Sequence, residues 1–133
     1  MFLDRILNSG NAPLIERMVQ FTGQRHTVLA ENIVNSSTPG YRTKDLSLPA
    51  FQKALIKRVE QRKNAPPGSV GFDDLGAQIK NPRAGILFHD RNNRSMETLM
   101  SDFSSNAMKH NMYTEMMRKQ YGKIEMVLKG QIA

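Results

Sequence analysis

Apolar residues near the beginning of the chain recur with the three- and four-residue spacing of a helix. This pattern predicts an amphipathic helix over residues 13–35. Pro13 suits the first turn, where the missing N–H leaves no hydrogen bond unmade, and Asn11 is a candidate N-cap. The apolar stripe of this helix consists of Leu14, Ile15, Met18, Val19, Phe21, Val28, Leu29 and Ile33.

The last third of the chain carries a longer pattern of the same kind. It predicts a helix over residues 96–129, about 50 Å long at 1.5 Å per residue. Ser95 is a candidate N-cap, and Gly130 is suited to end the helix in a left-handed conformation. The residues that follow each other at alternating four- and three-residue steps are Leu99, Phe103, Asn106, His110, Tyr113, Met117, Gln120, Ile124 and Val127.

The segment between these helices has no sustained periodicity. Residues 46–51 read as a short extended stretch, and a short helix is expected from Pro49 or Ala50 into a basic run that ends at Lys63. Residues 64–71 are rich in proline and glycine and indicate a flexible linker. Two further extended segments are predicted at Ala77–Ile79 and Gly85–Phe88.

These patterns divide the chain into an N-terminal helical part (1–35), a middle segment (36–94) and a C-terminal helical part (95–133). They predict a mainly α protein. We expect the two long helices to pack as an antiparallel, coiled-coil-like core domain, with the middle segment irregular, extended and partly flexible.

The apolar stripes of two helices leave surface to be buried against other chains, which is typical of an assembly subunit. We expect the terminal helices to become fully ordered only when neighbours cover these stripes. The predicted assembly interface consists of Ile15, Met18, Leu29, Met96, Leu99, Met100, Phe103, Tyr113, Met117 and Ile124.

The 133 residues carry a formal net charge of +7. A basic balance suits nucleic acid, an anionic membrane surface or an acidic polymer such as cell wall. The basic run Lys53–Lys63 has no interleaved aromatic residues, so a solvated helix face is the alternative to nucleic-acid binding, and we expect no nucleic-acid partner. No window approaches the ~20 apolar residues of a membrane span. The N-terminus does not resemble a cleaved secretory signal peptide. Without a membrane span or a signal peptide, these features alone suggest a cytoplasmic protein.

Chemistry-bearing residues are few. Cysteine is absent, which excludes disulfides, thiolate nucleophiles and cysteine metal sites. The pair His89-Asp90 is compatible with a general base, but no nucleophile or ligand set accompanies it. His26 and His110 fall on predicted helices, where packing or surface roles are expected, and Met116 and Met117 are expected to pack and not to bind metal. The sequence therefore predicts no enzyme, no cofactor and no metal.

A turn motif ends the first helix. Asn35 is expected to leave the helix in a left-handed conformation. Pro39 disfavours helix at the residue before it, and Pro39-Gly40 fits the centre of a type II turn, where glycine supplies the positive φ. Asn32 and Asn35 are expected to bond backbone groups at the helix end. Tyr41 then begins an extended stretch.

The sequence from Ala30 to Tyr41 resembles the N-terminal signature of the flagellar axial family, which includes rod, hook and hook-associated proteins. Val34 stands where that family usually has alanine. The matching residues are Ala30, Asn32, Ile33, Asn35, Thr38, Pro39, Gly40 and Tyr41.

A second string, from Phe88 to Glu97, resembles the segment that precedes the C-terminal helix in the proximal rod proteins of this family. Arg91 replaces a glycine that is usual there. The two resemblances cover roughly half of the chain. The matching residues of the second string include Phe88, His89, Asp90, Asn92 and Asn93.

The resemblance implies a structural subunit of the proximal rod, assembled helically around the export channel and transmitting motor torque. It implies export through the flagellar type III apparatus without a cleaved signal, and a place in the periplasmic rod. The implied partners are further copies of itself, FlgC-like and FlgF-like rod proteins, a FliE-like adaptor and the MS ring, with peptidoglycan nearby. A different rod paralogue and a basic nucleic-acid-binding helical protein are the alternatives.

Overall fold

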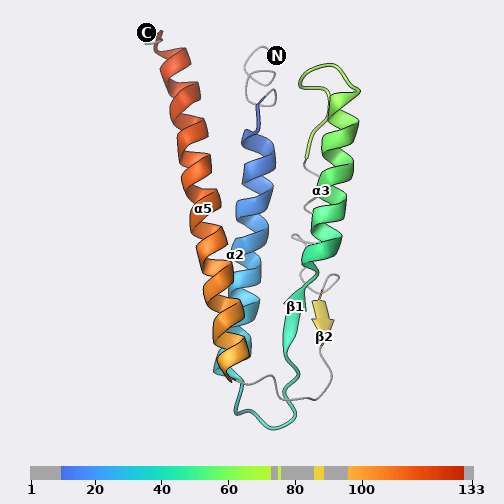
Figure 1. Cartoon of the computed structure of the whole chain (residues 1–133), viewed down its shortest axis with the longest axis vertical. Helices are drawn as coiled ribbons and strands as arrows, with labels where there is room; N and C mark the ends of the chain where they lie inside the picture. The colour runs from blue at the N-terminus through green and yellow to red at the C-terminus, as the bar shows by residue number, and fades with distance from the viewer. Residues whose placement is uncertain (1–9, 73–74, 76–85, 89–95, 131–133) are drawn as a thin grey trace.

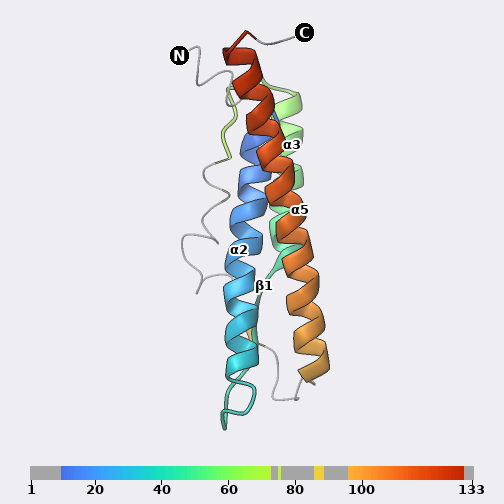
Figure 2. The same ribbon diagram turned by 90° about the vertical axis from the view of Figure 1, so that its left-hand side faces the viewer.

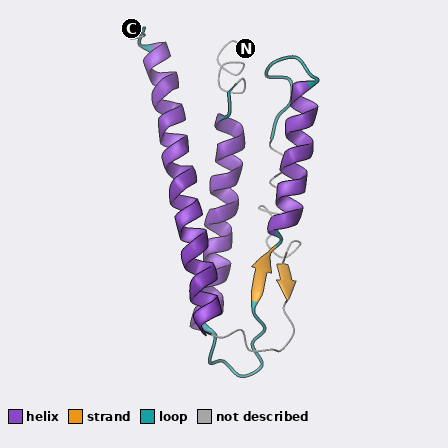
Figure 3. Cartoon of the chain, in the orientation of Figure 1, coloured by secondary structure: helices purple, strands orange, loops and turns teal. Residues whose placement is uncertain are grey.

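In the part of the chain that the structure describes, three helices lie side by side: α2 (Ala12–Val34), α3 (Leu48–Lys63) and α5 (Met96–Leu128) (Figures 1 and 3). A computed structural model describes residues 10–72, 75, 86–88 and 96–130. α2 lies between α3 and α5 in Figure 1 and runs antiparallel to α5. The prediction of a mainly α protein with long N- and C-terminal helices is confirmed.

Helix α2 begins and ends close to the predicted residues, but its caps differ. Pro13 lies in the first turn as predicted, whereas the Asn11 side chain makes no capping hydrogen bond. Asn35 has φ −94° and is not left-handed, so that prediction is wrong. The physical reason is a pair of hydrogen bonds to one carbonyl: the backbone N–H and the side-chain Nδ2 of Asn35 both donate to Glu31 O.

Helix α5 is 33 residues long and lies beside α2 in both views (Figure 2). Its end is as predicted, because Gly130 adopts φ +65° directly after the last turn. Leu99 and Asn106 are buried, on the side that faces α2. The proposed cap Ser95 lies outside the described residues.

The helix of the middle segment begins just before the predicted start, so the prediction that residues 46–51 are all extended is wrong for residues 48–51. Ser47 caps α3 by accepting a hydrogen bond from Ala50 N at 3.3 Å, so the helix begins at Leu48 and includes Pro49 in its first turn. Before it, the short strand β1 (Lys44–Leu46) pairs antiparallel with β2 (Ile86–Phe88). β2 matches the predicted extended segment, whereas residues 77–79 lie outside the described part.

A hydrophobic core joins the middle segment to α2. The rings of Phe21 and Phe51 stack with centroids 4.1 Å apart, and Val28 and Leu46 are buried beside them. α2 therefore buries residues on two sides, one against α5 and one against β1 and α3. Burying large side chains such as these contributes about 1.5–3 kcal/mol each.

Candidate assembly surface

The turn motif after α2 forms a tight turn as predicted. Tyr41 N donates to Thr38 O at 3.2 Å, and Gly40 between them has φ +74°. A Cβ at Gly40 would meet no neighbour, so glycine is favoured there for its conformation alone. Val34, the departure from the family string, is 80% exposed and disturbs no packing.

Asn32 is the residue of this motif that ties α2 to the chain after the turn. It is 2% exposed. Its Oδ1 accepts from Lys44 N at 2.8 Å and its Nδ2 donates to Lys44 O at 2.6 Å. The Tyr41 hydroxyl also donates to Asn32 Oδ1, at 3.2 Å. The Asn32 amide thus bonds the Lys44 backbone in the way that a neighbouring β-strand would. The sequence had instead suggested that Asn32 bonds backbone groups at the end of its own helix.

An ion pair close to this amide fixes β1 further. The guanidinium of Arg25 donates from Nε and Nη2 to the two carboxylate oxygens of Asp45, at 2.8 and 2.9 Å. The hydrogen bond to Asp45 raises the pKa of Arg25, which stays charged. Such two-point pairs fix orientation as well as distance. The start of the middle segment is therefore rigidly attached to α2.

Polar side chains join α2 and α5 at the centre of their contact. Asn106 is 1% exposed and donates from Nδ2 to Thr22 O at 2.9 Å. The hydroxyl of Thr22 lies 2.9 Å from His110 Nδ1. The two helices approach closely here, since a Cβ added at Gly23 would lie in van der Waals contact with His110 Cε1, at 3.4 Å. Buried amides of this kind favour one register of a helix pair.

The two described histidines both take part in helix packing. His26 stacks on Phe103, with ring centroids 4.2 Å apart, and His110 bonds Thr22. Among the described residues, no group of three histidine or acidic side chains could hold a metal ion. No described helix is long and apolar enough to cross a membrane.

Exposed methionines of α5 form a long apolar ridge that no described residue covers. We call Met96, Met100, Met108, Met112 and Met116 the α5 methionine row; each is 44–71% exposed. Successive members are four or eight residues apart, so they follow one i, i+4 ridge that winds around the helix. Ridges of this kind pack into the grooves of a facing helix, and methionine adapts to irregular partners.

The predicted interface residues fall into two groups. Met96 and Met100 belong to the exposed row. The others face the interior of the subunit: Ile15, Leu29 and Leu99 are buried, and Met18, Phe103, Tyr113, Met117 and Ile124 are half-buried. Met108 and Met112 were missed, although their four-residue spacing from Met116 was visible in the sequence.

Of the second motif, the structure describes Phe88, which lies in β2 opposite Lys44. His89, Asp90, Asn92 and Asn93 lie outside the described residues. The basic run on α3 presents Lys53, Lys57 and Lys63 to solvent, with Ile56 exposed among them.

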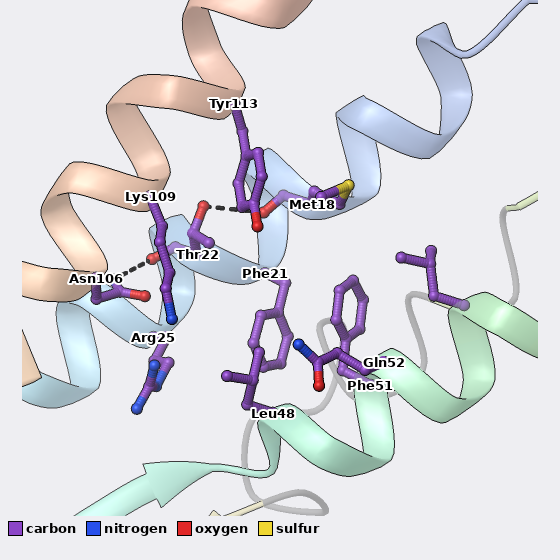
Figure 4. Close-up of a pocket in the computed structure, with 11 residues that line it drawn as sticks. Met18, Phe21, Thr22, Arg25, Leu48, Phe51, Gln52, Asn106, Lys109 and Tyr113 are labelled. Atoms are coloured by element: carbon purple, nitrogen blue, oxygen red, sulfur yellow. Dashed lines mark hydrogen bonds between the residues drawn. The ribbon is translucent and has the colours of Figure 1, made fainter.

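A hollow opens over α2 between α3 and α5 (Figure 4). Its volume is about 130 Å³. We call it the three-helix hollow. Phe21, Leu48 and Phe51 form its apolar side, and Asn106 and Lys109 lie on its α5 side.

In the described part of the chain, the exposed apolar ridge on the longest of three side-by-side helices is the candidate functional site, a surface for contact with another chain. Two curated proteins are similar to this chain over most of its length, and both are named flagellar basal body rod protein FlgB. The protein of Aquifex aeolicus is 26% identical over 117 residues, covering 88% of this chain and 91% of its own. That of Salmonella typhimurium is 23% identical over 124 residues, covering 86% and 90%. No protein-family model and no solved structure matches the chain.

Proposed function

We propose that this chain is a rod subunit of the bacterial flagellar basal body, the counterpart of FlgB in the proximal rod. The similarity to two rod proteins, which spans most of the chain, supports this assignment. The structural observation that carries it is the α5 methionine row, since an exposed apolar ridge on the longest helix needs a partner chain.

In this proposal the subunit has a mechanical role and no catalytic one. Copies assemble helically around the export channel, next to FlgC-like and FlgF-like subunits, the MS ring and a FliE-like adaptor, and transmit motor torque through the periplasm. Export precedes assembly and uses the flagellar type III apparatus without signal cleavage. The rigid attachment of β1 to α2 by Asn32 and Arg25 suits a part that carries load.

The proposed interface is centred on the exposed members of the predicted set, Met96 and Met100, and on the rest of the row. The buried members, such as Ile15 and Leu99, support it by holding α2 and α5 together. A charge at Leu99 therefore tests folding, whereas a charge at an exposed methionine tests assembly.

Gene deletion tests the assignment to the rod. Removing the gene from the organism that encodes it should abolish motility, and electron micrographs of its basal bodies should show rings without a rod. Returning the gene should restore both. Normal rods in the deletion strain would overturn the proposal.

A point variant tests the surface. Met108→Glu should leave the purified chain folded, with an unchanged circular dichroism spectrum, and should fail to restore motility to the deletion strain. Gln61→Glu, which adds the same charge to an exposed position of α3, is the matched control and should restore it. Full motility with Met108→Glu would remove the methionine row from the interface.

A further inference from the structure

The three-helix hollow and Met108 of the α5 methionine row lie on different sides of α5. Met100 and Lys109 are nine residues apart, which places them about 180° around the helix at 3.6 residues per turn. Met108 and Tyr113 are five residues apart, or about 140°. Lys109 and Tyr113 line the hollow, and Met108 is 71% exposed. Each subunit thus carries Met108 on one side of α5 and the recess on another.

The size of the hollow and its phenylalanine wall suit one long apolar side chain, and Arg25 and Lys109 are its charged lining residues. Its 130 Å³ is close to the roughly 150 Å³ of an engineered apolar cavity that takes up benzene. The stacked rings of Phe21 and Phe51 form one wall (Figure 4). Sulfur of methionine makes favourable contacts with aromatic rings, worth about 0.3–1.5 kcal/mol.

We propose that the three-helix hollow receives the Met108 side chain of a second copy of this chain. The inference rests on the proposed function, which calls for self-assembly, and it names the surface that the methionine row meets. A flexible, unbranched side chain can enter the recess without moving the phenylalanines that line it.

Charge supports a second copy as the occupant. Glu115 lies seven residues after Met108 and therefore on the same face of α5, about 10 Å further along. It is exposed, at 3.2 Å from Arg118 of its own helix. Lys109 lies at the edge of the hollow. When Met108 of one copy enters the hollow of the next, an acid beside the ridge approaches a base beside the recess.

A junction between two different surfaces has a consequence for symmetry. Each copy offers a free ridge after its hollow is filled, and a free hollow after its ridge is docked. Such heterologous contacts do not stop at a dimer but continue as a ring or an open helix. A helical rod requires this kind of contact.

Cysteine pairing tests the inference directly, because the chain has no cysteine of its own. Purified Met108→Cys and Gln52→Cys chains, mixed at high concentration under mild oxidation, should form a disulfide-linked heterodimer. Gln52 is exposed and lines the hollow, so its replacement leaves the core intact. The matched control is Lys53→Cys, one residue along and on a different side of α3, which should give at least tenfold less cross-linked product.

A second measurement separates failure of this inference from failure of the proposed function. Gln52→Trp fills the mouth of the hollow, and it should fail to restore motility to the deletion strain although the chain is folded. If Gln52→Trp restores motility and the Gln52→Cys pair gives no more product than the Lys53→Cys pair, the hollow is not the receiving surface. The assignment to the rod would then stand or fall on gene deletion alone.

Discussion

The side-chain amide of Asn32 pairs with both backbone groups of Lys44, accepting from its N–H and donating to its carbonyl. Replacing Asn32 with alanine leaves both groups without their partner. We expect Asn32→Ala to lower the free energy of unfolding by about 2–3 kcal/mol. Urea denaturation followed by circular dichroism measures this loss.

Asn35 provides the control for that experiment. It is partly exposed, and its amide bonds Glu31 O within the same helix end, where water can replace it. Asn35→Ala should cost less than about 1 kcal/mol. Equal losses at the two positions would show that the Asn32 amide contributes no more than an ordinary helix-end bond.

The amide that joins α2 to α5 should behave similarly. Asn106→Ala removes the donor to the buried Thr22 carbonyl, and the expected loss is about 2 kcal/mol. Ser105→Ala, at the adjacent exposed position, should change stability by less than about 0.5 kcal/mol. An Asn106→Ala chain as stable as the original would mean that packing alone fixes the register of the two helices.

Two glycines should respond to alanine in opposite directions. Gly122 lies inside α5, and a Cβ added there would have no neighbour within 4 Å, so Gly122→Ala should stabilise the chain by up to about 1 kcal/mol. Gly40 has φ +74°, and Gly40→Ala should cost about 1–2 kcal/mol because L-residues disfavour that conformation. Thermal unfolding of both variants and the original chain measures the two changes in midpoint temperature, which should have opposite signs.

Tyr41 makes stability depend on pH in the alkaline range. Burial and the nearby charge of Glu31 raise its pKa above the ordinary 10.0. The folded state therefore holds the phenolic proton more tightly than the unfolded state does. The resulting stabilisation is complete below about pH 10 and is lost as pH rises through the folded pKa.

The variant Tyr41→Phe isolates this effect from the titration of lysines. Urea midpoints of both chains should be compared at about pH 9 and about pH 11. The original chain should be the more stable of the two at the lower pH, and the difference should shrink at the higher one. A constant difference would show that Tyr41 has the same pKa in the folded and unfolded chains.

Local features were predictable from the sequence because their causes lie within a few residues. The stripe through Leu99 and Tyr113 follows from helical periodicity, and it is the face of α5 that turns inward. The turn at Pro39-Gly40 follows from two residues with strong backbone preferences. The helical stripe and the turn are both determined by residues close together in the sequence.

Features that depend on distant partners were not predictable in this way. Asn32 was expected to bond its own helix end, but β1 offers two backbone groups that pair with it at once. Phe51 was placed in an irregular segment, although it stacks on Phe21 in the core. The stripe through Leu99 was assigned to contacts between chains, but α2 of the same chain covers Leu99, and Met108 on another side of α5 stays exposed.

The polar contact between Asn106 and Thr22 spans 84 positions of the chain. Native contacts so far apart in sequence carry a large loop-closure entropy and slow the folding of a domain. Because α2 has its main partner in α5, its α5 side stays uncovered until residues 96–128 are available. If the chain is exported as proposed, α2 would therefore keep this side uncovered until α5 has also passed through the channel.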